Sequence, residues 1–306
     1  MTSRYGRSAQ LDAISVAGRP APGLRCASPG VTGSKGLETM DVQLAALCAL
    51  TFVIHLIGTL AYAVRIAGVR TRRIAVSFAL FNVLALVSRT SGSFQGPFLA
   101  KRIELALHGG GAGHLLSDFR WLLASATLAT VVGALAVPTF QRLFSRAVLH
   151  FQAHRSIPKL LLHGFARGGL AYIRDAVTLP AASHLQDLRR ERALSMPVIG
   201  LNVGVQALAT VAVFASLYAG ALEPAYRVTA ASLASVVSGA ATILLFVFID
   251  PHLSVMTDDV VEGRVSEAAF RRTVVWLSGT RVAGALLAQV VLVPAAMLIA
   301  AIAGRI

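Results

Sequence analysis

Polar side chains lie inside or beside long apolar stretches of this 306-residue chain, and their chemistry is what the fold must accommodate. Between residues 54 and 104, an arginine-dense turn joins two apolar runs, and the second run contains amides and a further arginine. The residues concerned are Arg65, Arg70, Arg72, Arg73, Asn82, Arg89 and Gln95. A charge or amide near the centre of a bilayer costs a few kcal/mol on insertion scales, so we expect a buried partner or a wet cavity around Arg65, Asn82, Arg89 and Gln95.

The polar segment SRTSGSFQG, which lies between Val87 and Pro97, leaves two interpretations of Arg89. A helix broken at this segment places Arg89 in the protein interior, because irregular backbone at membrane depth is tolerated only against protein or a water-filled cavity. Alternatively, the helix leaves the membrane here and Arg89 lies at the interface.

A second polar group lies further along the chain. Asn202, Gln206 and Thr210 recur every four residues and therefore share one helical face. Hydrogen bonding to a neighbouring helix is the usual role of amides in membrane bundles, and lining a substrate path is the alternative. His55 lies within the apolar run IHLIGTLAY, where it either hydrogen-bonds inside the bundle or takes part in proton coupling.

The composition places these residues in a membrane protein. Hydrophobic residues make up 56% of the chain and charged residues 14%, with a mean hydropathy of +0.70, which excludes an ordinary soluble domain. A helix crosses a hydrocarbon core of about 30 Å with about 20 apolar residues. We therefore predict an all-α polytopic transmembrane bundle of about six spans, whose topology stays open. The windows are residues 42–64, 74–97, 121–140, 197–221, 228–249 and 281–303.

The loops carry the signals for orientation and lipid contact. Basic residues are concentrated in the first, third and fifth loops, which predicts that these loops face the cytoplasm and that both termini face outward. Residues 158–177 of the long third loop mix apolar and basic side chains. This mixture is typical of a helix lying in the interface against anionic lipids, although a helix packed on the cytoplasmic ends of the spans is an equal alternative.

Residues 1–40 differ from the rest of the chain. They contain scattered Arg, Ser, Gly and Pro and no apolar run, which favours a disordered tail. Since Met40 directly precedes the first span, the alternative is a start-site error, with translation beginning at Met40 and not at Met1. Residues 41–306 then form a single transmembrane domain.

The chain lacks the common enzyme motifs GxSxG, HExxH and a complete Walker A loop, so we expect neither catalytic residues nor a cofactor. His108, His114 and Asp118 flank the run GGGAG and can in principle hold a metal. We favour a flexible loop with incidental histidines and predict no metal site. The formal charge of +14 is expected to meet anionic membrane lipids, with no role for nucleic acid.

The run IHLIGTLAYAVRIAGVRTRRIAVSFALFNVLALVSR, followed by QGPFLAKRIE, resembles the signature of the bacterial Amj family, the lipid II flippases that act as an alternate to MurJ. The resemblance implies a multi-pass protein of the bacterial cytoplasmic (inner) membrane. It also implies transport of lipid II, an undecaprenyl-diphosphate-linked disaccharide pentapeptide, from the inner to the outer leaflet during peptidoglycan synthesis. It supplies no set of functional residues, so site assignments rest on physical arguments.

For such a substrate, arginine suits the diphosphate because its guanidinium stays charged and donates two parallel hydrogen bonds to phosphate oxygens. We predict capture at the cytoplasmic face by the arginines of the first turn, with Arg89 deeper, while amides replace water around the sugars and His55 couples protons. The capture residues are Arg65, Arg70, Arg72 and Arg73, and the amides are Asn82, Gln95, Asn202 and Gln206.

Two other classes of function stay open. The first is a membrane scaffold or assembly factor for cell-envelope synthesis, which docks a partner on its basic cytoplasmic loops. The second is an enzyme acting on a lipid phosphate, which needs converging carboxylates, whereas the carboxylates here are scattered singly: Glu104, Asp118, Asp175 and Asp250. The sequence does not indicate an oligomeric state.

Overall fold

The computed structural model describes residues 41–109, 112–154 and 195–306, and these residues form helices without any strand. The elements are α1 (Val42–Thr71), α2 (Ile74–His108), η1 (Ala112–His114), α3 (Leu115–His154), α7 (Met196–Leu222), η2 (Pro224–Tyr226), α8 (Arg227–Leu244), η3 (Leu245–Ile249), α9 (Asp250–Val261) and α10 (Glu267–Ala303). The predicted tail, residues 1–40, and the predicted interfacial helix, residues 158–177, lie outside the described residues, so both stay predictions.

Six helical segments are long and apolar enough to cross a membrane, which confirms the predicted all-α polytopic bundle. The segment from Pro224 to Val261 counts as one span, although it comprises η2, α8, η3 and α9. Each predicted window lies inside a helix, but the helices run further than the windows. An apolar window marks only the hydrocarbon crossing, and a helix continues as long as its backbone hydrogen bonds and packing allow.

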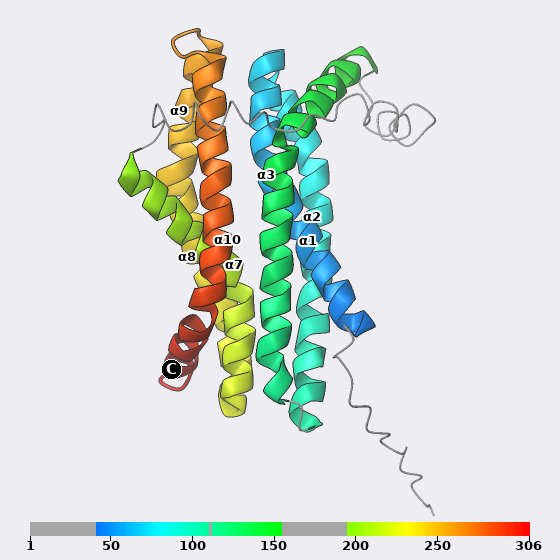
Figure 1. The fold of residues 1–306 in the computed structure, drawn as a ribbon, viewed down its shortest axis with the longest axis vertical. Helices are drawn as coiled ribbons and strands as arrows, with labels where there is room; N and C mark the ends of the chain where they lie inside the picture. The colour runs from blue at the N-terminus through cyan, green and yellow to red at the C-terminus, as the bar shows by residue number, and fades with distance from the viewer. Residues whose placement is uncertain (1–40, 110–111, 155–194) are drawn as a thin grey trace, which may run out of the picture. The chain divides into compact units, whose positions relative to one another are not determined.

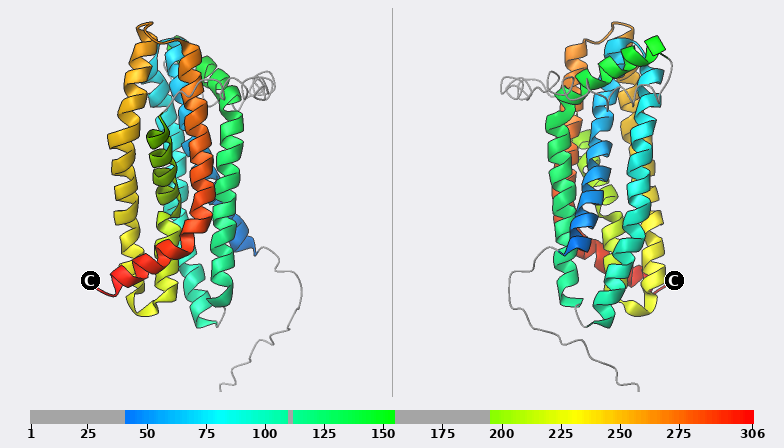
Figure 2. Two further views of the ribbon diagram at one scale, coloured as in Figure 1. Left: turned by 60° about the vertical axis from the view of Figure 1, so that its left-hand side comes forward. Right: turned by 90° about the vertical axis from the view of Figure 1, so that its right-hand side faces the viewer.

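The helices form two groups (Figures 1 and 2). In one group α1 packs against α2 and α3, and in the other α7 packs against α8 and α10. The groups meet where α10 contacts α3 and α1. Gly284 allows α10 to approach α7 closely, since a Cβ at this position would lie 2.6 Å from the Cβ of Gln206. Small residues at such crossings stabilise membrane bundles through backbone proximity.

Apolar side chains of the described helices form three clusters, and two of them flank the polar residues of α1 and α10. One cluster joins Leu47, Phe119, Phe214 and Leu292, from α1, α3, α7 and α10. The other includes Ile66 of α1 with apolar residues of α3, η3, α9 and α10. In lipid these side chains gain little from leaving hydrocarbon, so close packing is what stabilises the clusters. The stretches of α1 and α10 between the two clusters contain the polar residues described below.

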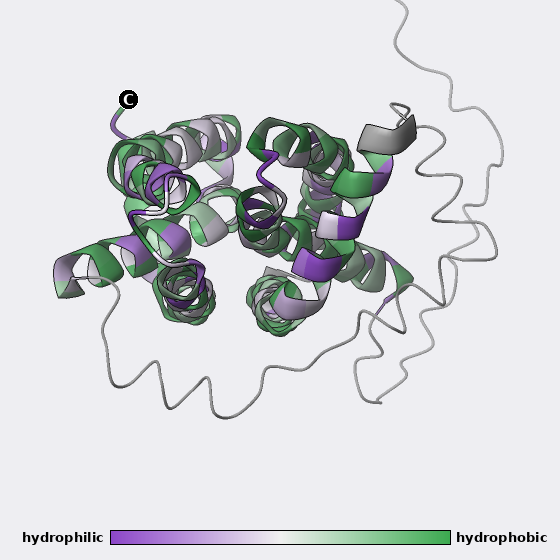
Figure 3. Ribbon diagram, turned by 90° about the horizontal axis from the view of Figure 1, so that it is seen from above, coloured by the Kyte–Doolittle hydropathy of each residue, from purple (hydrophilic) through white to green (hydrophobic). Residues whose placement is uncertain are grey.

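Viewed from above, most of the helical ribbon has the colour of hydrophobic residues (Figure 3). Hydrophilic residues are concentrated at the turns, as expected for a protein whose outer surface meets lipid. Proline bends one span: α10 turns aside in its C-terminal part, and Pro294 lies inside this helix (Figures 1 and 2).

The helix α2 is continuous through SRTSGSFQG, so the predicted break is wrong. The hydroxyls of Thr90, Ser91 and Ser93 donate to carbonyl oxygens four residues earlier in the same helix, which satisfies these groups without unwinding the backbone. The alternative, that Arg89 lies at the interface, stays a prediction, because a helix such as α2 can run on from Arg89 to His108 beyond the membrane surface. Arg89 lies about 22 Å along the helix from Ile74, at 1.5 Å per residue.

The fifth span contains a π-helical turn, η3. Pro251, two residues after this turn, has no N–H, and its ring would collide with the carbonyl four residues earlier in a regular α-helix. The wider turn accommodates the ring, and the helix continues to Val261. Asp250 therefore lies inside the span, whereas the sequence windows ended just before it.

Candidate functional site

Three helices converge on Arg281, which lies in the middle part of α10. Its Nη1 donates to Oε1 of Gln206 on α7 over 3.1 Å. The phenol of Tyr62 on α1 lies close enough to interact with the charge of the guanidinium. Its Nη2 lies over Gly58, where a Cβ would be only 2.5 Å away. Because glycine has no side chain, Gly58 leaves room for the guanidinium of Arg281.

The surroundings of Arg281 leave its charge uncompensated. Within the described residues no carboxylate pairs with it, and its partners Gln206 and Tyr62 are neutral. Its Nε is buried and has no hydrogen-bond partner there. His55 lies close enough to Arg281 to interact with its charge. An interior arginine of this kind keeps a positive charge and at least one N–H donor that its described neighbours leave unsatisfied.

The amides of α7 face α10, as the four-residue spacing predicted, and Asn202, Gln206 and Thr210 are all buried. Asn202 donates to the hydroxyl of Thr280 over 2.7 Å, and its own Oδ1 is buried without a partner. The predicted hydrogen bonding to a neighbouring helix is therefore confirmed for Asn202 and Gln206. Together with Arg281, Tyr62, Thr280 and His55, these amides form what we call the polar layer.

Arg65 lies nearer the end of α1 and has the partner that its position predicted. It forms an ion pair with Asp250 of α9 over 3.0 Å, and its guanidinium lies 5.5 Å from the centre of the Phe78 ring of α2. Arg65 follows Gly58 by seven residues, so it lies about 10 Å along α1 from the Arg281 level. The pair joins the two helix groups, and its charges cancel.

The three arginines of the first turn lie at the end of the bundle and are exposed. Arg70 pairs with Glu267 at the start of α10 over 3.6 Å. Arg72 ends α1 in the left-handed conformation, with φ of 53°, and Arg73 precedes α2. Their exposure agrees with a position at the membrane surface.

The remaining candidates lie apart from the polar layer. Gln95 is buried and donates to the hydroxyl of Thr51 over 2.5 Å, which joins α2 to α1. The side chains of Asn82 and Arg89 are exposed, and among the described residues neither forms a hydrogen bond or ion pair. A shallow groove of about 520 Å³ between α1 and α2 is lined mainly by apolar side chains such as Leu50, Leu86 and Phe94.

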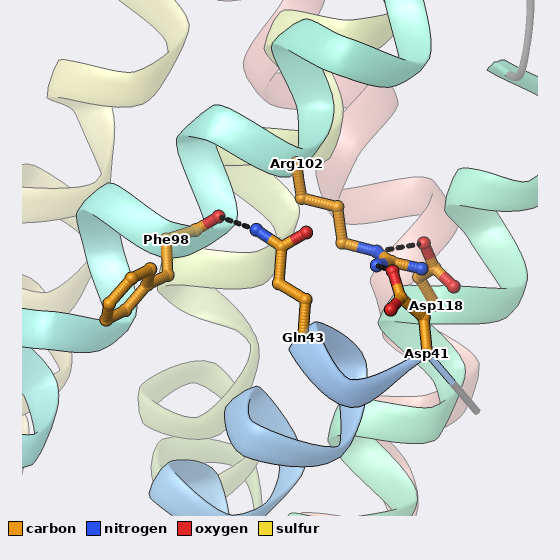
Figure 4. A network of polar contacts seen from close by, with 5 residues as sticks. All are labelled: Asp41, Gln43, Phe98, Arg102 and Asp118. Carbon is orange, nitrogen blue, oxygen red and sulfur yellow. Dashed lines mark hydrogen bonds and ion pairs between the residues drawn. The ribbon is translucent and has the colours of Figure 1, made fainter. Parts of the chain in front are cut away.

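A second interior arginine lies toward the other end of the bundle (Figure 4). Arg102 of α2 donates from Nε to Asp118 of α3 over 2.7 Å and from Nη1 to Asp41, before α1, over 3.1 Å. Nearby, Gln43 donates to the carbonyl of Phe98. Asp118, considered above as a metal ligand, therefore holds helices together.

Sequence reasoning missed Arg281, Asp250 and Tyr62. Arg281 opened the sixth apolar window and Asp250 followed the fifth, so both were assigned to span ends. One signal could have extended the sixth span: Phe270, Val274 and Leu277 precede Arg281 at helical spacing, and all three are buried. Tyr62 carried no signal, because it falls in an apolar run.

Comparison with known proteins identifies the family. The family model Amj, described as alternate to MurJ, matches residues 50–303. The lipid II flippase Amj of Bacillus subtilis (strain 168) is 34% identical over 266 residues, which cover 86% of this chain and 98% of the relative. No solved structure matches the chain. The family model matches most of the spans, and this chain aligns with almost the whole of the relative. Both findings agree with the resemblance seen in IHLIGTLAY and the turn that follows. The chain belongs to the Amj family.

Proposed function

We propose that this chain is a lipid II flippase, which moves undecaprenyl-diphosphate-linked peptidoglycan precursor from the inner to the outer leaflet of the bacterial cytoplasmic membrane. The observation that carries the proposal is a polar layer inside a six-span bundle, in a chain that matches a lipid II flippase over nearly the whole of that relative. No step of this activity requires a catalytic residue.

The layer has the chemistry that the task requires. A head group with a diphosphate, sugars and a peptide loses water when it enters hydrocarbon, and each unsatisfied polar group costs several kcal/mol. Guanidinium and amide groups inside the protein replace that water, while the polyprenyl chain stays in lipid. Arg281, Gln206 and Asn202 present these groups between α1, α7 and α10.

We assign roles along α1 in the order in which a head group would meet them. Arg70, Arg72 and Arg73 attract the diphosphate at the end of the bundle, and Arg65 lies about 7.5 Å further in than Arg70. Asn202 and Gln206 follow at the level of the polar layer, where His55 is the candidate for proton coupling. We leave Asn82, Arg89 and Gln95 out of this path, because these residues lie apart from the layer.

The membrane potential supplies a direction. With the basic loops on the cytoplasmic side, an inside-negative potential favours outward movement of an anion by about 2.3 kcal/mol per charge per 100 mV. The exposed arginines at the same end, such as Arg72 and Arg73, also suit contact with anionic membrane lipids.

The test is lipid II accessibility in cells depleted of other lipid II flippases. An agent that attacks only outward-facing precursor should act on cells expressing this chain as it does on cells expressing the Bacillus subtilis relative. Cells with an empty vector provide the baseline. If the chain reaches the membrane in normal amounts and accessibility stays at that baseline, transport of lipid II is the wrong function.

A further inference from the structure

We propose that Arg281 is the residue that binds the diphosphate of the lipid-linked substrate, in a site completed by Gly58, Tyr62 and Gln206. This assignment rests on the proposed function and adds the residue and the ligand group to it. The residue was absent from the candidates that the sequence indicated.

The charges around Arg281 point to an anionic ligand. Four other arginines of the described helices have a carboxylate partner: Arg65 with Asp250, Arg70 with Glu267, Arg102 with Asp118 and Asp41, and Arg227 with Glu104. Arg281 instead donates to the neutral amide of Gln206, and no ion pair joins it to a carboxylate among the described residues. An uncompensated charge at membrane depth is unfavourable, and an anion that binds beside it removes that penalty.

The neighbours hold the guanidinium without neutralising it. Gln206 accepts one N–H and ties the guanidinium to α7, and the neutral phenol of Tyr62 on α1 lies beside the same group. Its Nε is left without a partner among the described residues. A fixed, charged fork with a free donor matches the bidentate geometry in which arginine binds phosphate oxygens.

Gly58 is the specificity-determining position in this arrangement. The Cβ of any larger residue at position 58 would lie 2.5 Å from Nη2 of Arg281, so an alanine here displaces the guanidinium from its neighbours. The depth of the site also fits transport. Arg281 follows Glu267 by 14 residues and lies about 21 Å from the start of α10, so a head group crossing the membrane passes this level.

Binding can be measured with the full-length protein in lipid nanodiscs. The chain has two tryptophans: Trp276 precedes Arg281 by five residues, and Trp121 is exposed on α3. In a Trp121→Phe background, Trp276 reports on titrations with undecaprenyl diphosphate, undecaprenyl phosphate and uncharged undecaprenol. We expect a saturable response that is strongest for the diphosphate, and Arg281→Gln should weaken it at least about tenfold, as loss of one charged contact does.

Three further variants separate binding from folding. Arg102→Gln removes an interior arginine that already has carboxylates, and it should bind the diphosphate as the parent does. Gly58→Ala keeps the charge but displaces it, and should weaken binding several-fold. Arg281→Lys keeps the charge without the fork and should recover part of the affinity. If Arg281→Gln fails to fold, these last two variants decide the matter.

The outcomes distinguish this assignment from the proposed function. Unchanged diphosphate affinity in folded Arg281→Gln or in Gly58→Ala would falsify the assignment, and so would equal affinity for undecaprenol. If the parent chain makes lipid II accessible in cells under any of these results, the flippase function stands and the diphosphate binds elsewhere. If the parent gives no accessibility but binds the diphosphate through Arg281, the function fails and the site stands.

Discussion

Arg102 and Arg281 both lie between three helices, but their surroundings have opposite charge. Arg102 faces two carboxylates, Asp118 and Asp41, and both of its contacts are ion pairs. Arg281 faces a phenol and an amide, with no carboxylate among the described residues. Arg102 thus has two carboxylate partners for one positive charge, whereas Arg281 has none among the described residues.

This difference separates two uses of an arginine in a membrane bundle. An ion pair in low dielectric fixes the helices that carry it, and neither charge is then available to a ligand. An arginine held by neutral acceptors stabilises the empty protein less and binds an anion better. We therefore regard the Arg102 network as structural and the Arg281 layer as functional, and each prediction below tests this division.

The largest effect is expected for Arg281→Ala in cells that depend on this flippase. Growth should be lost while the amount of protein in the membrane stays within about twofold of normal, because the residue contributes little pairing energy. Arg102→Ala should do the reverse, with lower protein amounts but transport per molecule retained. Immunoblots of membranes and the lipid II accessibility assay measure the two quantities. Equal loss of transport per molecule in both variants would remove the distinction.

The next effect concerns the ion pair between the two helix groups. Asp250→Asn leaves Arg65 partly buried without a carboxylate and should destabilise the purified protein by about 2 kcal/mol, less than a fully buried pair because both side chains are partly exposed. Thermal unfolding measures it, with Asp258→Asn, an exposed position on the same helix, as the matched control. A double variant with Arg65→Gln should regain part of the loss. Additive losses would mean that the pair is unimportant.

A smaller effect is expected where the carboxylates are redundant. Asp118→Asn leaves Arg102 with Asp41, so the loss of stability should be about 1 kcal/mol. Asp41→Asn should cost less, because the Asp41 side chain is 61% exposed and the contact is longer. Unfolding of the two single variants and their combination measures this. The combination should lose more than the sum, since Arg102 then has no carboxylate, and a simple sum would contradict redundancy.

The smallest effect is expected for Arg89→Ala. Its side chain is exposed on α2 and lies apart from the polar layer, so transport should stay within about twofold of the parent. The accessibility assay measures it, with Arg281→Ala as the inactive reference. Complete loss of transport at a normal protein level would move the path to the outer face of α2.

Much of the fold could be predicted from the sequence because a lipid crossing needs a length of apolar chain, and hydropathy measures that length. The same measurement failed for Arg281 and Asp250. A window ends at the first strong charge, whereas a helix ends only where its backbone does, and α10 begins 14 residues before Arg281. Spacing correctly placed Asn202 and Gln206 on one buried face. It could not show that Gln95 donates to Thr51 or that Arg89 has no partner among the described residues, since partners on other helices depend on the packing of the bundle.

The π turn at Leu245–Ile249 determines the side of the fifth span on which its charge lies. Each residue of an α-helix turns the chain by about 100°, so a turn with one extra residue rotates everything after it by that amount. Without it, α8 would continue against α7 as before, but Asp250 would face away from Arg65. Deleting one residue from this turn would keep the span apolar and long enough to cross the membrane. Asp250 would then face lipid, where no guanidinium compensates its charge, although the hydropathy of the span is almost the same.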